Sequence, residues 1–471
     1  MRKTKVICTI GPACDSEEIL SQMCLEGMNV ARLNFSHGAH ADHQEKIDLI
    51  KRVREKLGLP ISIMLDTKGP EYRIKTFKDK KVTLVDGQTF TFTTEEIVGD
   101  ETRVSVNYDH LTEDLEKGDR ITVNNGLVIF TVTEISGNDV ICQVVVGGDL
   151  SDRKSMSFPN KLMLHHDFLS EQDKLDLLFG INNDVDFVAA SFVSTRKDVQ
   201  DMRDFLDANG GENIDIIAKI ENRAGVDNID DICAVADGIM VARGDLGVEI
   251  PFIEVPSIQK YLINKCRMLG KRVITATEML ESMIHNPRPT RAELSDVANA
   301  VYDGTSAVML SGETATGKYP ALAVKNMVEI AEYTEKCIDY RARFKTSDFK
   351  IKNKLDAVSH STCSMAIDLD AKCIVVNSIS GTTARMVSRF RGPVDILGTT
   401  TDVKAWRKLN LSWGVTPVLC EEYNSTDVMF YTSLNRAKEV FGLQKGDNVV
   451  LTGGQINGKS GNTNVIKVET V

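Results

Sequence analysis

The stretch DIIAKIENRAGVDN (residues 215–228), followed by GIMVARGDLGVEIP (residues 238–251), decides the fold of this chain. Each segment is a short apolar run that ends abruptly in charge. Lys219 and Glu221 close the first run, and Arg243 and Asp245 follow the second. Parallel strands of an α/β barrel deliver polar side chains at their carboxyl ends in this way. Two carboxylates suit a hard divalent cation, and the lysine suits a phosphate or a developing oxyanion.

Eight apolar runs share this design, with β-forming residues inside and polar residues at the far end. They start at Lys5, Asn29, Ile61, Asp186, Asp215, Gly238, Arg272 and Ala307. Helix-like segments separate most of them. The predicted helix starts pair a capping residue with an acidic residue three positions later: Asp15 with Glu18, Ser170 with Asp173, and Thr290 with Glu293. Eight such units predict an α/β protein with a closed (β/α)8 TIM barrel. A doubly wound open sheet is the main alternative, and the even spacing favours the barrel.

Two further regions depart from the barrel pattern. Residues 70–165 alternate like β-strands, and Asn125-Gly126 is typical of a tight hairpin turn, so this insertion is predicted to be a small β-barrel domain that acts as a lid. Residues 345–471 alternate strands with helices and are predicted to form an open α/β domain. The stretch RARFKTSDFKIKNKLD (341–356), short of large apolar residues, is the predicted connection. The barrel would then comprise residues 1–69 and 166–344.

Composition narrows the class of protein. The 471 residues are 42% hydrophobic and 26% charged, which is typical of a globular protein of several domains. The net charge of -11 disfavours nucleic acid or an anionic membrane as the main partner. Ten cysteines without a CxxC pair indicate reduced thiols, and hence a cytoplasmic protein. No apolar run approaches the length of a transmembrane helix.

Lys219, Glu221 and Asp245 form the first candidate site. Taken singly, Lys219 and Glu221 could be a structural ion pair, and Asp245 could be a helix N-cap. Together, three charged groups at one end of adjacent strands are costly unless a cation or an anionic ligand compensates them. We therefore predict that they bind a divalent cation and an anionic substrate.

Further candidates lie at the ends of other predicted strands. They are Arg32, Asn34, Ser36, His37, Asp66, Thr67 and Lys68 on the second and third strands, and Thr277, Ser311 and Glu313 on the last two. An arginine can bind a phosphate through two hydrogen bonds, and clustered oxygens suit a second cation. Ordinary turn and cap chemistry explains the Asn, Ser and Thr residues equally well.

The carboxyl-terminal domain carries one more candidate site. A predicted strand there is followed by Ser380, Gly381, Thr382 and Thr383, which open a helix. Their backbone N–H groups and hydroxyls could bind a phosphate, and a glycine turn with a threonine N-cap is the alternative explanation.

These motifs resemble those of the pyruvate kinase family, and the resemblance extends from Lys5 to the carboxyl end. The shared motifs occur in the family's order: RLNFSHG (32–38), LDTKGPEYR (65–73), KIEN (219–222), MVARGDLGVEIP (240–251), TATEMLESM (275–283), NPRPTRAE (286–293), DGTSAVMLSGETATGKYP (303–320) and SGNTN (460–464). The resemblance implies a barrel, a lid inserted after the third strand and a regulatory α/β domain. It also implies transfer of the phosphoryl group of phosphoenolpyruvate to ADP, giving pyruvate and ATP, the last step of glycolysis, by a homotetramer.

The resemblance further implies a role for each candidate residue. Lys219 would neutralise charge on the moving phosphoryl group and the enolate oxygen, and Arg32 would grip the phosphoryl group. The other assignments are Gly244, Asp245 and Thr277 for the substrate; Asn34, Arg73 and Lys154 for the nucleotide; Glu221 and Asp245 for Mg²⁺, with Mn²⁺ as a substitute; Thr277, Ser311 and Glu313 for proton delivery; and Asn34, Ser36, Asp66 and Thr67 for K⁺. Glu71 predicts dependence on K⁺, because family members with lysine at this position tend not to need the ion.

Three departures from the family pattern limit these assignments. The lid reads VNNGL (123–127) where the family usually has VDDGL, so Asn124 can offer Arg32 only a neutral acceptor, which predicts a weaker closed lid and a raised Michaelis constant for nucleotide. KSMSFPN (154–160) replaces KGVNLPG but keeps Lys154. Glu421 stands where members activated by fructose 1,6-bisphosphate often carry lysine, so Ser380–Thr383 is expected to bind AMP, a sugar monophosphate or nothing.

Two rival functions remain open on the sequence. A Mg²⁺-dependent barrel lyase or mutase acting on pyruvate or phosphoenolpyruvate would share the cluster of Lys219, Glu221 and Asp245, but it has no need for a lid over a nucleotide. A catalytically silent sensor of phosphorylated ligands would be expected to have lost at least one of these three residues.

Overall fold

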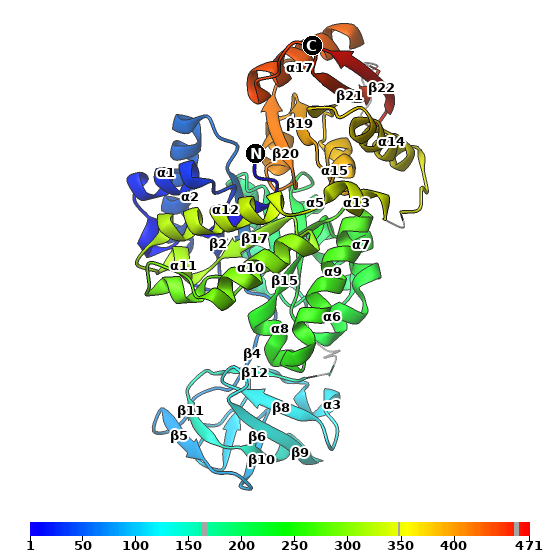
Figure 1. The fold of residues 1–471 in the computed structure, drawn as a ribbon. Coiled ribbons are helices and arrows are strands. Elements are labelled where there is room, and N and C mark those ends of the chain that lie inside the picture. Colours follow the sequence, from blue (N-terminus) through cyan, green and yellow to red (C-terminus); the bar gives the residue numbers. More distant parts are fainter. Residues whose placement is uncertain (160, 162–166, 347–348, 456–460) are drawn as a thin grey trace.

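The computed structural model describes residues 1–471 except 160, 162–166, 347–348 and 456–460. Its three parts follow one another along a line, with the barrel in the middle, the β-rich insertion at one end and the carboxyl-terminal domain at the other (Figure 1). The predicted boundary at 165/166 and Ser460 of the SGNTN motif lie outside the described residues.

Eight parallel strands form a closed barrel, which confirms the predicted (β/α)8 fold and excludes the open sheet. The strands are β1 (Lys5–Thr9), β2 (Val30–Asn34), β3 (Ser62–Asp66), β13 (Phe187–Ala190), β14 (Asp215–Ile220), β15 (Gly238–Ala242), β16 (Arg272–Ala276) and β17 (Ala307–Leu310). They are neighbours in chain order, and β17 pairs with β1 to close the barrel. Each of the eight predicted runs supplies one of these strands.

Side chains alternate between the inside and the outside of the barrel. Ile7, Phe187 and Ile217 belong to the core inside it, whereas Val6 and Val188 pack in the core beneath the surrounding helices. Because this alternation has a period of two, the residue two positions after each inward residue also points inward. Polar residues at the ends of the strands therefore share one space above the apolar interior.

Helices surround the barrel (Figure 1). They are α1 (Glu17–Glu26), α2 (His40–Leu57), α4 (Glu171–Asn182), α5 (Arg196–Ala208), α6 (Arg223–Asp227), α7 (Ile229–Val235), α8 (Arg243–Glu249), α9 (Val255–Leu269), α10 (Arg291–Asp303), α11 (Gly312–Ala315) and α12 (Pro320–Lys336), with 3-10 turns η1 (Pro12–Cys14), η2 (Phe252–Glu254) and η3 (Glu281–Ile284). Ser170 and Thr290 form the predicted capping boxes.

The predicted start at Asp15 is wrong by one residue. Ser16 is the N-cap of α1, and its side chain accepts a hydrogen bond from the backbone N–H of Ile19. Asp15 is instead the C-cap of the preceding turn η1, so the first position available as the N-cap of α1 is the next residue.

The insertion forms the predicted β domain. Its elements are β4 (Tyr72–Arg73), β5 (Lys81–Leu84), β6 (Thr89–Thr93), β7 (Arg103–Ser105), α3 (Leu111–Asp114), β8 (Arg120–Val123), β9 (Val128–Ser136), β10 (Asp139–Val146), β11 (Gly148–Ser151) and β12 (Ser155–Ser157). Seven of the strands make one sheet in the order β4-β12-β8-β9-β10-β6-β7. A bridge between Ile74 and Val106 joins its two edges, as a small barrel requires.

The tight turn predicted at Asn125-Gly126 joins β8 to β9. Asn125 and Gly126 have φ values of 57° and 79°, and Asn124 also has a positive φ, of 58°. The N–H of Leu127 donates to the carbonyl of Asn124. These are the left-handed conformations that asparagine and glycine tolerate best.

The carboxyl-terminal domain is an open sheet in the order β20-β19-β18-β21-β22, flanked by helices. Its elements are α13 (Tyr340–Lys345), α14 (Lys354–Asp368), β18 (Cys373–Asn377), α15 (Thr382–Ser388), β19 (Asp395–Thr400), α16 (Val403–Leu409), β20 (Val415–Leu419), α17 (Thr426–Phe441), β21 (Asn448–Gly454) and β22 (Thr463–Thr470). The stretch predicted as a connection contains part of α13, and its Phe344 and Phe349 pack against the domain core.

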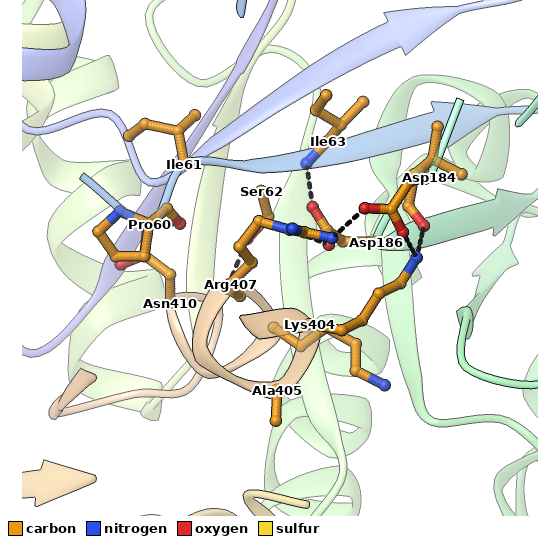
Figure 2. A network of polar contacts seen from close by, with 12 residues as sticks. Pro60, Ile61, Ser62, Ile63, Asp184, Asp186, Lys404, Ala405, Arg407 and Asn410 are labelled. Atoms are coloured by element: carbon orange, nitrogen blue, oxygen red, sulfur yellow. Dashed lines mark hydrogen bonds and ion pairs between the residues drawn. The ribbon is translucent and has the colours of Figure 1, made fainter. Parts of the chain in front are cut away.

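This domain meets the barrel at the end opposite the inserted β domain (Figure 1). Figure 2 shows the contact: Arg407 of α16 binds Asp186 at 2.7 Å and Asp184 at 2.6 Å, and Lys404 also binds Asp184. Burial opposes the charge on Arg407, but its contacts with Asp186 and Asp184 outweigh this effect and raise its pKa. Just beyond α16, Leu411 is fully buried within the core inside the barrel.

Among the described residues, the structure contains no helix with the length and apolar character that a membrane span requires.

Candidate active site

Lys219 lies at the centre of the polar space above the barrel interior. It follows the inward residue Ile217 by two positions, so the strand directs its amine inward. Its Nζ lies 3.0 Å from Oε1 of Glu221 and 3.2 Å from Oδ1 of Asp66, and it donates to Oγ of Ser191 at 2.8 Å. Burial opposes the charge on Lys219, but the two carboxylates outweigh it and raise its pKa. The amine is therefore a fixed cation.

Arg32 is the second cation of this space. Its Nε donates to Oδ2 of Asp66 at 2.6 Å, and its Nη1 donates to Oγ1 of Thr9 at 2.9 Å. Asp66 is fully buried; burial favours its protonation, but Arg32 and Lys219 together hold its pKa below the ordinary value. One carboxylate thus keeps two cations side by side, and both face the mouth of the barrel.

Glu221 and Asp245 are suited to a divalent cation. Glu221 is fully buried; its Oε2 accepts the N–H of Phe192 at 2.6 Å, and its Oε1 lies 3.0 Å from the Lys219 amine. Burial, with a smaller contribution from Asp245, raises the pKa of Glu221. In the described part of the chain, no group of three or more His, Cys, Asp or Glu is placed to hold a metal. A cation held by the carboxylates of Glu221 and Asp245 would take its other ligands from water and substrate, as Mg²⁺ usually does.

The ends of β15 and β16 are linked through Thr277. Its Oγ1 accepts the backbone N–H of Gly244 at 2.9 Å and donates to the carbonyl of Ala276 at 2.6 Å. Thr277 has a φ of 67°, an unusual conformation for a β-branched residue. Such outliers cluster at functional sites, because the surrounding structure must hold them in place.

Glu313 has a structural role next to the site. Its Oε2 accepts the N–H of Ser311 at 2.7 Å and its Oε1 accepts the N–H of Leu280 at 3.0 Å, so it ties the loops after β16 and β17 together. The hydroxyl of Ser311 is buried and has no hydrogen-bond partner among the residues that the structure describes. Ser311 therefore presents a free polar group, while Glu313 fixes its position.

The predicted K⁺ ligands lie where β2 and β3 end. Asn34 pairs in register with Asp66, and its Oδ1 accepts the N–H of Ser36 at 3.1 Å. Thr67 is buried beside them, and its Oγ1 accepts the N–H of Ser191 at 3.2 Å. Asn34 and Asp66 are thus neighbours on adjacent strands, and Ser191 contacts both Asp66 and Thr67.

The predicted nucleotide residues of the insertion lie at its junction with the barrel. Arg73 binds Glu71 at 2.5 Å, and the carbonyl of Lys154 accepts the N–H of Ile74. A cavity of about 150 Å³ separates the insertion from the barrel, and it is lined by Glu71 and Asn125 on one side and Asp245 on the other. In the described part of the chain, Arg32 makes no hydrogen bond to Asn124.

Known proteins share this architecture over the whole chain. The family described as "Pyruvate kinase, barrel domain" matches residues 1–324, and "Pyruvate kinase, alpha/beta domain" matches residues 356–469. The chain belongs to the pyruvate kinase family. Pyruvate kinases of Clostridium acetobutylicum and Clostridium perfringens are 48% and 46% identical to it, and each match covers 100% of both chains. A crystal structure of a pyruvate kinase from Cryptosporidium parvum has a TM-score of 0.95 at 37% identity and covers 100% of this chain and 96% of that one.

Like other members of the pyruvate kinase family, the chain has an α/β domain of its own, and this domain contains the larger cavity. The cavity has a volume of about 520 Å³ and lies at the carboxyl ends of β18 and β19. Ser380, Thr382 and Thr383 line it, whereas Gly381 does not. Gly381, with a φ of 75°, is the N-cap of α15, so the threonine cap considered from the sequence is wrong.

Two polar residues of this pyruvate kinase site were missed by the sequence reasoning. Ser191 accepts the hydrogen bond of Lys219, and Thr9 accepts that of Arg32. Both follow an inward-pointing residue by two positions, Ala189 and Ile7. The period-two pattern carried this signal, because it marks the first polar inward residue of every barrel strand.

Proposed function

We propose that this chain transfers the phosphoryl group of phosphoenolpyruvate to ADP, giving pyruvate and ATP, at the mouth of the barrel. The observation that carries the proposal is the contact of Lys219 with both Asp66 and Glu221, beside Arg32. Phosphoryl transfer requires mostly positioning and stabilisation of negative charge, and two buried cations above a carboxylate pair supply both.

The residues have distinct parts in this proposal. Arg32 binds the phosphoryl group of phosphoenolpyruvate, and Lys219 stabilises charge on that group in transfer and on the enolate oxygen. Gly244 and Thr277 hold the substrate carboxylate through the N–H and hydroxyl groups that pair with each other in this structure. Asn34, Arg73 and Lys154 bind the nucleotide phosphates at the junction of lid and barrel.

Glu221 and Asp245 would hold Mg²⁺, or Mn²⁺ in its place, and Asn34, Ser36, Asp66 and Thr67 would hold K⁺. When bound, these cations neutralise the charge of the phosphates and of the enolate. Thr277 and Ser311 then take part in delivering a proton to the enolate methylene carbon, and Glu313 positions Ser311 for this step.

Pyruvate formation from phosphoenolpyruvate, followed with lactate dehydrogenase and NADH, tests the proposal. We expect pyruvate to form only when ADP is present, because ADP accepts the phosphoryl group, and ATP to appear in equal amount. A Mg²⁺-dependent lyase or mutase would act equally well without ADP, and a sensor without activity would form no pyruvate at all. Either of these results would contradict the assignment.

Dependence on K⁺ follows from Glu71. Its carboxylate pairs with Arg73. A lysine at this position would supply an ammonium group in place of K⁺, and a glutamate does not. We expect activity to fall by about tenfold or more when Na⁺ or choline replaces K⁺, because a charge that stabilises the transition state is lost. The variant Glu71→Lys should lose most of this dependence. Equal activity of the unmodified protein in the three salts would rule out the K⁺ site.

The lid is proposed to close less firmly than in relatives with VDDGL. Asn124 can accept a hydrogen bond from Arg32, but a neutral acceptor binds a guanidinium about half as strongly as a carboxylate does. The left-handed φ of 58° at Asn124 suits either asparagine or aspartate, so the backbone does not explain the departure.

The finer assignments rest on the family resemblance and on local charge. The cavity lined by Ser380, Thr382 and Thr383 is proposed to bind a phosphorylated effector with one phosphate, such as AMP or a sugar monophosphate. Glu421, the residue on which the sequence prediction rested, is not among the described residues that line this cavity, but the neighbouring exposed Glu422 lines it and would repel a second phosphate. A homotetramer and a cytoplasmic location are proposed for the chain because they are typical of the family.

A further inference from the structure

Arg243 lies beside the proposed site, and its side chain contacts the loop that follows β16. It is the first residue of α8, directly before Gly244 and Asp245, and its side chain is almost completely buried. Its Nη2 donates to the carbonyl of Thr277 at 2.6 Å and to that of Glu278 at 3.0 Å, and its Nε donates to the carbonyl of Thr277 at 3.2 Å. One guanidinium thus holds two consecutive carbonyls of the loop after β16.

The backbone that Arg243 holds is strained. Thr277 has a φ of 67° and Glu278 a φ of 54°, so two neighbouring non-glycine residues adopt the left-handed conformation. This conformation is unfavourable for a β-branched residue and persists only where the surroundings impose it. The hydrogen bonds from Arg243 go to the carbonyls of these same two residues, so they stabilise the conformation directly.

The guanidinium is itself fixed from the other side. Its Nη1 lies 2.8 Å and 2.6 Å from the two carboxylate oxygens of Asp296 on α10. The same Nη1 also lies 3.4 Å from Oε1 of Gln259, and Nη2 lies 2.9 Å from Sδ of Met279. A planar group with this many partners has one orientation, which an ammonium on a lysine stem cannot reproduce.

A reciprocal link joins the two strand ends. The side chain of Arg243 binds the backbone of Thr277, and the backbone N–H of the next residue, Gly244, binds the Thr277 hydroxyl at 2.9 Å. The Thr277 backbone is therefore held by the Arg243 side chain, and its hydroxyl by the N–H of the residue that follows Arg243. A misplacement of about 1 Å is enough to cost about 10²-fold in rate.

We propose that Arg243, oriented by Asp296, is a positioning residue that sets the Thr277 hydroxyl for protonation of the enolate. This inference rests on the proposed function, in which Thr277 takes part in that step. In protonation, the electrons of the enolate C=C bond form the new C–H bond at the methylene carbon, and the enolate oxygen becomes the carbonyl oxygen of pyruvate. The proton comes from the Thr277 O–H bond, which breaks, and the threonine oxygen then takes a proton from solvent. Arg243 touches none of these atoms and acts only through Thr277.

Exchange of the pyruvate methyl protons with D₂O, measured by NMR with the complete protein, Mg²⁺, K⁺ and ATP, isolates this step. We expect Arg243→Lys to lower the exchange rate by about 10²-fold, and Asp296→Asn to lower it less, while the KM for phosphoenolpyruvate changes by less than about threefold. As a matched control, Arg223→Lys removes a guanidinium whose partner is Glu254 on a neighbouring turn and should leave exchange unchanged.

The variant Thr277→Ala separates the inference from the proposed function. If Thr277→Ala leaves exchange intact, the role of Thr277 in the proposed function is wrong. If it slows exchange and Arg243→Lys does not, only the role of Arg243 is wrong. Because Arg243 acts through Thr277, adding Arg243→Lys to Thr277→Ala should slow exchange no further, and losses that add overturn the inference. If Arg243→Lys does not fold, the same comparison with Asp296→Asn decides the question.

Discussion

Replacing Lys219 by methionine is expected to lower kcat for pyruvate formation by about 10³-fold or more. Lys219 is the fixed cation of the site, and a charge that stabilises a transferring phosphoryl group is worth this much in other enzymes. Its Nζ contacts Glu221 and Asp66, and methionine fills a similar volume without the charge. A coupled assay with saturating phosphoenolpyruvate, ADP, Mg²⁺ and K⁺ measures the loss.

The same variant separates the two halves of the reaction. Thr277 and Ser311 are unchanged in it, so exchange of pyruvate methyl protons with solvent should remain measurable after phosphoryl transfer has stopped. Lys197→Met is the matched control, because Lys197 lies on the surface and pairs with Asp201 at 2.5 Å. Near-normal turnover of Lys219→Met would falsify the assignment of Lys219.

Replacing Arg407 by methionine is expected to be the most destabilising of these substitutions. Arg407 pairs with Asp186, which is fully buried and whose other oxygen accepts the N–H of Ile63 at 2.9 Å (Figure 2). Without Arg407, Asp186 keeps only the more distant Arg54, at 3.9 Å, as an ion-pair partner among the described residues, and removing one partner of a buried ion pair costs about 3–5 kcal/mol. For a domain of this size we expect the midpoint of thermal unfolding to fall by about 6 °C or more.

Lys404→Met is the control for this variant. Lys404 lies on the same helix and pairs with Asp184, whose side chain is 55% exposed, so its removal should cost less than about 1 kcal/mol. The two variants therefore each remove one ion pair between the domains, and they differ in whether the aspartate of that pair is buried or exposed. Equal melting temperatures of the two variants would mean that the buried pair does not hold the two domains together.

The barrel and the polar residues at its mouth were predictable because both follow from local patterns. Period-two alternation marks the inward positions, and charge at the end of each run marks the mouth, so Lys219 and Glu221 were found together with Arg32. The same rule would have found Ser191. The rule does not predict β22, because buried and exposed residues alternate only weakly along this edge strand.

Contacts between distant segments were beyond prediction. The sequence marks Arg243 as a charge after a strand, but its two carbonyl partners depend on the left-handed backbone of the next strand's loop. The choice between Asp15 and Ser16 as N-cap depends on where the turn η1 ends. Both outcomes are set by three-dimensional geometry rather than by residue type.

The position of Leu411 inside the barrel has a consequence for folding during synthesis on the ribosome. All eight barrel strands emerge before it, yet the apolar interior that they enclose is completed by this one side chain from the domain made last. During synthesis, the interior of the barrel therefore lacks this side chain until the carboxyl-terminal domain has been made. We expect truncated products that end before Leu411 to expose part of this apolar interior to solvent. Exposed apolar surface of this kind is what chaperones and proteases recognise.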